Sequence, residues 1–401
     1  SRGLGDVYKR QEPVDSRLLY NGIRLPEQWP PVRSSSSELE KGMSPFYLSD
    51  KPSVINISVG RQLFVDNFLI ESTNLKRTFY YPEYYSGNPI LTPEQDWEKT
   101  GTKGAAFAAP FSDGVWYDEK EGKYKMWYMA GGGSYATSGA GVTCYAESTD
   151  GIHWTKPTLS IVAGTNIVDY NSERDASVIW LDKQESNASK RYKMFLVTRE
   201  SGKWRYRYKT SPDGKVWRAA AQSEPIADRS TVYKNPFRNV WVYSMRHNIR
   251  VDANKLVRAR DYNENADPEA GTKKAEALLS AFWFGPWANE QHHTDYPNIA
   301  PAIYNQDATP YESIMLGFFS VWQGPENDVC ASDNVIKRNQ VMVGYSRDGY
   351  SWFREDMNPF HAVNTTTSDA WNQGNLQSVA GAPLIAVSYT HLRAHETTLH
   401  L

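Results

Sequence analysis

The chain has 401 residues, of which 40% are hydrophobic, 22% charged and 13% aromatic. Its formal net charge of −2 at pH 7 gives no electrostatic basis for binding nucleic acid or an acidic membrane surface. No run of eighteen apolar residues is present, so the sequence predicts no membrane span. The two cysteines, Cys144 and Cys330, are too few for a disulfide framework, and we expect both to be free.

The two ends of the chain do not share the pattern of the rest. Residues 1–11 and 387–401 resemble the adaptor-derived tails of translated environmental (metagenomic) fragments, and we interpret both as non-native. A signal peptide would then not be observable. Residues 12–60 are rich in Pro and Ser and have no periodicity, which predicts an extended N-terminal arm laid over the body of the protein. Residues 61–70 then predict two short strands around an Asp66-Asn67 turn.

Pairs of short alternating segments follow along the chain. Each pair has the pattern of a β-hairpin, and Trp116 and Trp180 mark the same place in the first two pairs, 64 residues apart. The four predicted hairpins are 114–118 with 124–128, 178–182 with 192–196, 230–235 with 240–243, and 302–305 with 313–316.

A second pattern recurs with the hairpins. It reads Ser-x-Asp-Gly-x-x-Trp and occupies residues 148–154, 211–217 and 346–352. Its Asp-Gly pairs are 63 and 135 residues apart, about one and two copies of a 65-residue unit, which indicates a repeat architecture. Asp-Gly favours a turn between strands, because Gly accepts a positive φ and Asp bonds its own backbone. In the third repeat, residues 258–264 stand in place of this turn.

Four antiparallel strands per unit, repeated radially, describe an all-β propeller. We predict five blades with the last one truncated, together spanning residues 61–386. The predicted blades cover about 100–165, 166–225, 226–290, 291–365 and, in part, 366–386.

With these repeats, residues 20–386 resemble the five-bladed propeller glycoside hydrolases of families 32, 43, 68 and 117. Residues 22–31 and 61–66 also resemble a bacterial family 32-like group without assigned specificity. The resemblance implies hydrolysis of a terminal sugar from an oligo- or polysaccharide, with acidic residues contributed by the innermost strands of successive blades. Such hydrolysis uses two carboxyl groups that flank the bond.

Aligning the hairpins places Asp175 and Asp228 at the same position of two consecutive blades, and we interpret them as the central carboxylates. Arg174-Asp175 resembles the Arg-Asp of the family 32 Arg-Asp-Pro motif, with Ala176 in place of Pro. The family's nucleophile motif is absent: the first blade has Phe111 at the equivalent position, and its nearest acid is Asp113.

Two further acids are candidates for the proton donor. Glu312 precedes an apolar strand, where a carboxyl group would have a raised pKa, and Asp295 lies just before the innermost strand of the fourth blade. Each of these acids could instead be a structural partner of an arginine. The candidate substrate-binding residues offer rings for stacking or polar groups for hydroxyls and anionic substituents: Asp113, Arg174, Arg229, Arg246, His247, Trp287, His292, His293 and Tyr311.

The arginines among them would suit a sulfated or uronic sugar. We expect a carbohydrate substrate, no nucleic-acid or membrane partner, a secreted or periplasmic location and no cofactor. No Cys or His pattern has zinc spacing, whereas the resemblance leaves open a structural calcium ion in the central channel. The alternatives are a non-catalytic carbohydrate-binding propeller, a sialidase-like or lyase propeller, and a scaffold for protein interaction.

Overall fold

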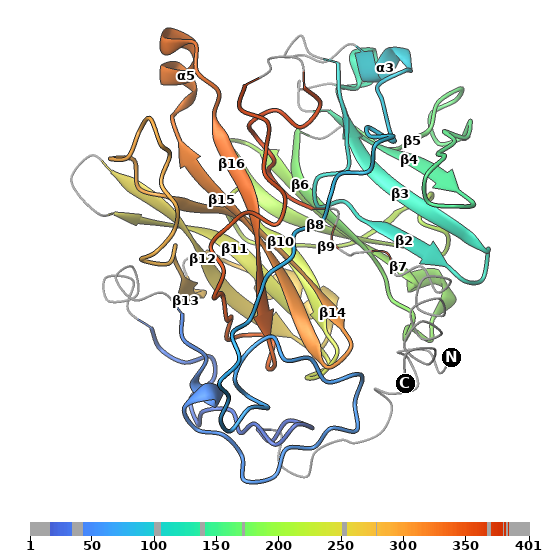
Figure 1. Ribbon diagram of the computed structural model, residues 1–401. Helices are drawn as coiled ribbons and strands as arrows, with labels where there is room; N and C mark the ends of the chain where they lie inside the picture. The colour runs from blue at the N-terminus through green and yellow to red at the C-terminus, as the bar shows by residue number, and fades with distance from the viewer. Residues whose placement is uncertain are drawn as a thin grey trace, which may run out of the picture.

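The computed structural model describes residues 17–33, 43–99, 106–136, 141–170, 173–250, 255–277, 279–366, 370–379, 381 and 384. The predicted tails 1–11 and 387–401 lie outside these residues. Within them the chain forms an all-β propeller of antiparallel blades (Figure 1). No helix of the described part is long and apolar enough to cross a bilayer.

The first two blades follow the predicted repeat. In blade 1, β3 pairs with both β1 and β2 on one side and with β4 on the other, and β4 pairs with β5. Blade 2 has the simple order β6-β7-β8-β9. The strands of blade 1 are β1 (Ala108–Ala109), β2 (Val115–Asp118), β3 (Lys123–Ala130), β4 (Val142–Ser148) and β5 (Ile167–Asp169). Those of blade 2 are β6 (Glu173–Leu181), β7 (Tyr192–Glu200), β8 (Lys203–Ser211) and β9 (Arg218–Gln222).

The next two blades have the same arrangement. Blade 3 has the order β10-β11-β12-β13, and blade 4 has the order β14-β15-β16, with a bridge from Val341 of β16 to His361. The strands of blade 3 are β10 (Thr231–Asn235), β11 (Val240–Arg250), β12 (Leu256–Asn265) and β13 (Ala281–Phe284). Those of blade 4 are β14 (Ala302–Tyr311), β15 (Ile314–Gly324) and β16 (Arg338–Ser346).

Short helices connect these strands. Most are single turns, so the sheets supply the framework and the helices only shape the loops. Their bounds are η1 (Phe46–Leu48), α3 (Asp96–Lys99), η2 (Gly133–Tyr135), η3 (Ala188–Lys190), α4 (Pro268–Lys274) and α5 (Asn327–Asp333).

The number of blades differs from the prediction. The described residues form four blades, not five. Residues 370–379, expected to begin a fifth, form no named strand and make only isolated bridges from Gln373 to Asn364 and from Asn375 to Asn339. The bridge to Asn339 places this segment beside β16 of blade 4.

The predicted strand pair at residues 61–70 is also wrong. Asp66 is fully buried and accepts hydrogen bonds from Arg347 Nε at 2.9 and 3.0 Å and from Arg347 Nη2 at 2.8 Å. It also accepts the backbone N–H of Phe68 at 3.0 Å. These hydrogen bonds fix the segment around Asp66 as an irregular loop instead of a pair of strands. The arm thereby packs at one end of the propeller, below β13 and β14 in Figure 1.

The Asp-Gly turns have one geometry in all three copies. Ser148, Ser211 and Ser346 each bond the Asp two residues on, at 2.9–3.0 Å, and accept the N–H of the following Gly at 2.8–2.9 Å. The Asp carboxylate then accepts the next two backbone N–H groups at 2.7–3.0 Å. Each glycine has a φ between +75° and +78°, which explains why the pattern requires Gly.

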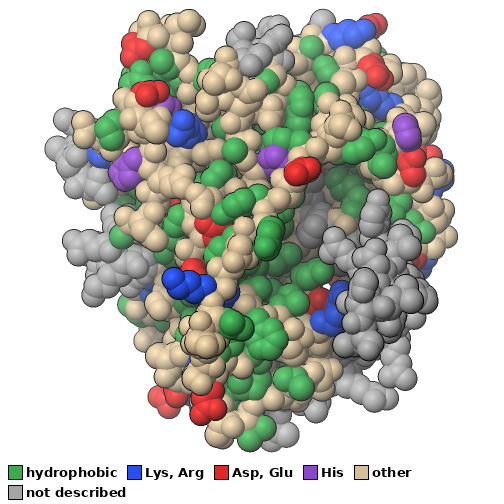
Figure 2. All heavy atoms as spheres, in the orientation of Figure 1, with side chains coloured by type: hydrophobic (Ala, Val, Ile, Leu, Met, Phe, Trp, Pro, Cys, Tyr) green, Lys and Arg blue, Asp and Glu red, His purple; other side chains and the backbone are tan. Residues whose placement is uncertain are grey.

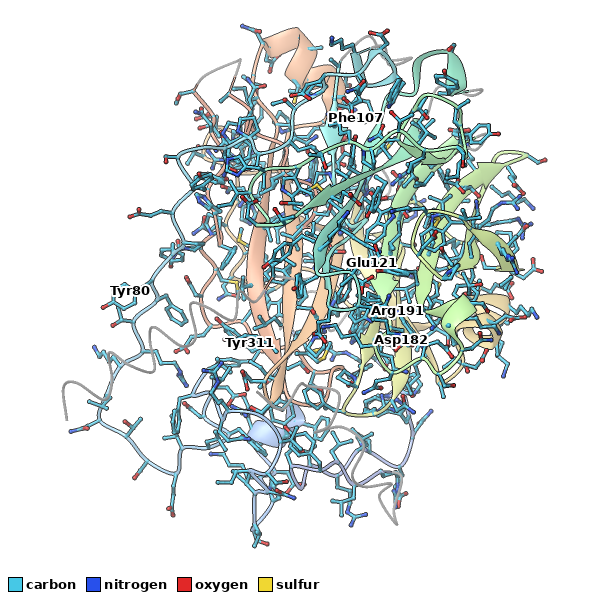
Figure 3. The ribbon with its side chains drawn as sticks, turned by 90° about the vertical axis from the view of Figure 1, so that its right-hand side faces the viewer. Tyr80, Phe107, Glu121, Asp182, Arg191 and Tyr311 are labelled. Atoms are coloured by element: carbon cyan, nitrogen blue, oxygen red, sulfur yellow. The ribbon has the colours of Figure 1, made fainter. Side chains whose placement is uncertain are left out.

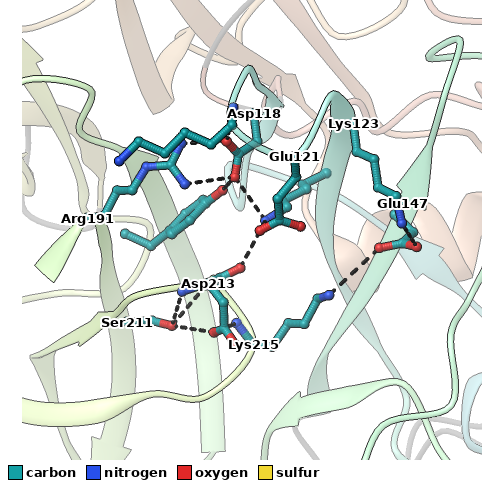
Figure 4. Close-up of polar contacts among 12 residues, drawn as sticks. Asp118, Glu121, Lys123, Glu147, Arg191, Ser211, Asp213 and Lys215 are labelled. Carbon is teal, nitrogen blue, oxygen red and sulfur yellow. Dashed lines mark hydrogen bonds and ion pairs between the residues drawn. The ribbon is translucent and has the colours of Figure 1, made fainter. Parts of the chain in front are cut away.

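Two of these turns also dock on the preceding blade. Trp127 of blade 1 donates its indole N–H to the carbonyl of Gly214 at 2.7 Å, and Lys125 reaches the carbonyl of Asp213 at 3.2 Å (Figure 4). In the same way Asn235 of blade 3 donates to the carbonyl of Asp348 in blade 4 at 2.9 Å. The repeated motif therefore joins neighbouring blades as well as turning the chain.

This docking predicts that Gly214→Ala destabilises the protein more than Gly202→Ala. Both glycines have φ near +79°, so both variants carry the left-handed penalty of about 1–2 kcal/mol. A Cβ at 214 would lie 2.4 Å from the Trp127 ring, whereas one at 202 meets nothing within 4 Å. Overpacking should cost Gly214→Ala about 1–3 kcal/mol more in the free energy of unfolding, measured by urea denaturation. Equal losses would mean that the turn does not clamp the two blades.

Candidate active site

The innermost strands of the four blades are β2, β6, β10 and β14. Strand β6 lies beside β10, and β10 beside β14. The backbone N–H of Ile179 in β6 donates to the carbonyl of Asp113, just before β2, at 2.6 Å. Asn305 of β14 donates to Ser112 at 3.2 Å, which joins the fourth blade to the first. These contacts join the innermost strands of the four blades into a closed ring around the propeller axis.

Equivalent positions of the four strands meet around one arginine. From blade 1 to blade 4, the residues at the hairpin ends of the innermost strands are Asp118, Asp182, Asn235 and Tyr311. In the same order, the residues seven positions earlier are Phe111, Asp175, Asp228 and Tyr304. The Arg229 guanidinium carbon lies 5.3 Å from the ring centre of Phe111 and 5.6 Å from that of Tyr304. Two carboxylates and two aromatic rings therefore surround the Arg229 side chain.

Arg229 is held in this place by several strands. Its backbone N–H donates to Asp175 Oδ2 at 2.6 Å, and its Nη1 lies 3.5 Å from Asp175 Oδ1. The same Nη1 donates to Gln377 at 3.1 Å. Its φ of +54° is rare for a residue with a side chain and is typical of functional sites. Although burial acts to lower it, Asp175, Asp307 and Asp228 hold the pKa of Arg229 above its ordinary value.

Asp175 and Asp228 keep the most exposure among the axial acids. Their side chains are 21% and 26% exposed, whereas that of Arg229 is only 5% exposed. Asp228 forms an ion pair with Arg246. On strand β11 the next residue, His247, bonds Asp261 at 3.1 Å through Nδ1. The prediction that Asp175, Asp228, Arg229 and Arg246 lie together agrees with this geometry.

Asp113 and Arg174 form a buried pair behind these groups. Arg174 Nη2 donates to both carboxylate oxygens of Asp113 at 2.9 Å, and Nη1 donates to Thr143 at 2.6 Å. Burial raises the pKa of Asp113, and Arg174 opposes that effect. Asp113 is fully buried, and Arg174 directs its donors at Asp113, at Thr143 and at the Asp175 carbonyl, so both side chains are engaged within the protein. We therefore correct their predicted role from substrate binding to support of the axial ring.

The sequence reasoning missed a fourth acid, Asp307 of β14. Asp307 is 3% exposed, and its Oδ2 accepts hydrogen bonds from Asn305 at 2.9 Å and from the Val379 N–H at 3.3 Å. Burial raises the pKa of Asp307 to about 7. Asn305 and Asp307 are two residues apart and so share one face of the strand, an unusual pair of polar groups in a buried segment that could have revealed the site.

Glu312 does not lie with the axial acids. It occupies the β14–β15 turn, at the opposite end of the strand from Tyr304, eight residues or about 26 Å away. It accepts hydrogen bonds from the backbone and side chain of Arg61, at 2.8 and 2.7 Å. Although burial acts to raise it, these bonds hold the pKa of Glu312 below its ordinary value. The expected raised pKa is wrong, because the N-terminal arm supplies a cation that the sequence did not place.

Tyr311 lies at the far end of β14 from the axial ring, and Asp295 belongs to a loop. Tyr311 adjoins Glu312 and lies well below Phe107 in the view of Figure 3. Asp295 is exposed in the loop between β13 and β14, where its backbone N–H donates to His293 at 3.1 Å.

The remaining predicted binding residues have local structural partners. Trp287 is buried beneath Arg354, whose guanidinium lies 4.5 Å from the ring centre. His293 is buried, and burial lowers its pKa. His292 is exposed, with Nδ1 2.8 Å from the carbonyl of Pro297. None of these three residues makes a hydrogen bond or ring contact with the axial groups in the described part of the chain.

Two surface hollows lie elsewhere on the molecule. One is bordered by charged side chains of the β2–β3 and β6–β7 turns, and Figure 3 shows three neighbours of that region, Glu121, Asp182 and Arg191, close together. The other lies between Trp29 and strand β12. We place the candidate site at the axis instead, because the acids of successive blades meet there. The segment that holds Gln377 and Val379 also reaches the axial groups: Gln377 accepts a hydrogen bond from Arg229, and the Val379 N–H donates to Asp307.

The described residues contain no group of three His, Cys, Asp or Glu side chains placed to hold a metal ion. The calcium ion left open by the sequence therefore has no ligand set among them. Charged side chains on the face seen in Figure 2 are scattered in small groups of both signs, in keeping with the net charge of −2.

The raised pKa of Asp307 predicts an unusual pH dependence of stability. Between its ordinary value of 3.8 and about 7, the folded state keeps a proton that the unfolded chain releases. The contribution of Asp307 to stability is therefore fully present below pH 4 and is lost as the pH rises to 7. Between pH 5 and pH 8, the free energy of unfolding of Asp307→Asn should therefore rise by about 2–3 kcal/mol relative to that of wild type, at about 1.4 kcal/mol per pH unit.

Urea denaturation at the two pH values measures this difference. The matched control is Asp50→Asn, because Asp50 is exposed and lies in the arm. A difference between Asp307→Asn and wild type that does not change with pH would contradict the assignment.

Comparison with known proteins finds only distant structural likenesses. No family model and no curated protein matches the chain. A fructofuranosidase from Schwanniomyces occidentalis is 13% identical with a TM-score of 0.40, over 67% of this chain and 48% of that one. An N-acetylgalactosamine deacetylase from F. plautii is 12% identical with a TM-score of 0.45, over 71% and 76%. A structure described as a glycoside hydrolase is 14% identical with a TM-score of 0.43, over 70% and 79%.

This chain thus spans about half the length of the fructofuranosidase that it matches. All three TM-scores are below 0.5, and we draw no conclusion from these likenesses.

Proposed function

We propose that the protein is a glycoside hydrolase that removes a terminal sugar at the propeller axis. The observation that carries the proposal is the ring of equivalent positions: Asp175 and Asp228 come from adjacent blades, and the aromatic residues Phe111 and Tyr304 complete the ring around Arg229. Hydrolysis of a glycosidic bond needs two carboxyl groups beside it. Aromatic rings offer flat apolar faces, which suit the faces of a sugar ring.

The two accessible carboxylates are the reacting pair in this proposal. Asp175 is fixed by the backbone N–H and the guanidinium of Arg229, which positions it without any movement of the main chain. Asp228 comes from the next blade and lies against Arg246, which can donate to a sugar hydroxyl. One carboxyl group would protonate the leaving oxygen, and the other would act as nucleophile or base. Asp113 and Asp307, both buried, support the arrangement from behind.

A secreted or periplasmic location belongs to the same proposal, since polysaccharide substrates are degraded outside the cytoplasm. A non-catalytic carbohydrate-binding propeller is the second candidate. It is favoured by one observation: each accessible carboxylate already has an arginine partner, Arg229 or Arg246, as expected for structural ion pairs.

Substitution of the reacting pair should separate these candidates. Asp175→Asn and Asp228→Asn should each lower kcat at least about 100-fold, the usual contribution of a positioned acid or base. The matched control is Glu312→Gln, which alters an acid at the far end of β14 and should leave kcat unchanged. Release of sugar from oligosaccharides and nitrophenyl glycosides provides the assay.

Full activity in Asp175→Asn would contradict the catalytic role of this residue. Sugar binding by the wild type without any product after long incubation would replace the hydrolase with the binding module.

A further inference from the structure

Three arginines gather at the axial ring. The guanidinium carbon of Arg258 lies 4.5 Å from the ring centre of Tyr304, and that of Arg229 lies 5.6 Å from the same centre. Arg246 is near enough to feel the charges of both Arg258 and Asp228. Burial lowers the pKa of Arg246, Asp228 opposes that effect, and the charge of Arg258 lowers it further. The protein therefore holds like charges close together, partly out of water.

One of these three arginines has no carboxylate partner. Asp175 pairs with Arg229 and Asp228 with Arg246, but Arg258 forms no ion pair with any described residue. A further arginine, Arg260, is fully buried and hydrogen-bonds only to neutral oxygens, including the Arg229 carbonyl at 2.9 Å, while Asp307 and Asp261 act on its charge.

Several donors of the three arginines are unused. Nε and Nη2 of Arg229, Nε of Arg246 and Nη1 of Arg258 are buried and have no hydrogen-bond acceptor among the described residues. A buried donor without an acceptor costs free energy, and more so when it carries charge. Arg229 as a whole is 96% buried, so bulk water does not supply acceptors for these donors. An oxyanion with several acceptor oxygens would satisfy both the charge and the donors.

We propose that Arg229, Arg246 and Arg258 bind an anionic substituent of the sugar, a carboxylate or a sulfate ester, with the sugar ring against Tyr304. The proposal rests on the assignment of the axial ring as the carbohydrate site and names its substrate class. Guanidinium groups recognise both anions through the same paired donors. The reacting carboxylates Asp175 and Asp228 would then face the bond while the arginines fix the orientation of the ring.

Titration calorimetry with defined sugars tests the proposal. The probes are galacturonic acid, glucuronic acid and glucose 6-sulfate, each compared with galactose and glucose. At low salt at least one anionic sugar should bind about tenfold more tightly than its neutral counterpart, and its affinity should fall as salt is added.

Arg258→Gln should weaken binding of that anionic sugar about tenfold and leave binding of neutral sugars unchanged. Arg258→Lys, which keeps the charge, should recover part of the loss. Arg218→Gln is the matched control, since Arg218 is an exposed arginine on the outer strand β9. Circular dichroism and Tm confirm that each variant is folded.

The outcomes separate the two proposals. Preference for the uronic acids or for the sulfate identifies the anion, and either preference supports the inference. Equal affinity for charged and neutral sugars, or unchanged affinity in Arg258→Gln, overturns it and indicates that water satisfies the arginine donors. Anionic sugar binding without hydrolysis of any substrate overturns the hydrolase alone, whereas hydrolysis of neutral sugars without anionic preference overturns this inference alone.

Discussion

The buried charge of Arg229 is the constraint on which the centre of this molecule depends. A guanidinium removed from water must be surrounded by carboxylates, carbonyls or aromatic faces, and no single blade supplies enough of them. Asp175 comes from blade 2, Phe111 from blade 1 and Tyr304 from blade 4. The stability of the folded chain and the geometry of the axial ring are therefore set by the same residue.

The hairpin ends of the blades are joined by other interactions. Neutral hydrogen bonds from aromatic and amide side chains to turn carbonyls hold neighbouring blades together, as Trp127 does with Gly214 and Asn235 with Asp348. Buried ion pairs are added where the hairpin of one blade meets the next, as between Asp118 and Arg191 (Figure 4). Asn235 and Asp118 each lie seven residues along an innermost strand from the axial position of their blade, so the blades are joined at two levels.

The repeat could be predicted from sequence because strands and Asp-Gly turns are local features. Three of the four hairpins and all three turns lie where the pattern indicated, and Asp175 and Asp228 both lie close enough to Arg229 to act on its charge. The alignment was wrong only in blade 4, where it ended the innermost strand near Asn305. The strand runs on to Tyr311, so the equivalent axial residue is Tyr304.

What the sequence could not supply were contacts between distant segments. Glu312 has the local surroundings of a general acid, and only the folded arm brings Arg61 to it. Asp307 lies within a buried strand, where a polar residue has no periodic signal, and its environment depends on the Val379 backbone. The blade count was wrong for a similar reason, because residues 370–379 contact distant residues of blade 4 through isolated bridges to Asn339 and Asn364.

The buried contact between Asp66 and Arg347 joins residues 281 positions apart in the chain. At 5–20 residues per second, a ribosome needs roughly 15–60 s to add that length. During this time the buried carboxylate of Asp66 has no cation to meet, whereas Tyr47 and Phe68 can already pack in the arm's own apolar cluster. The arm can therefore form its apolar cluster early, but it can dock on the propeller only after Arg347 has been synthesised.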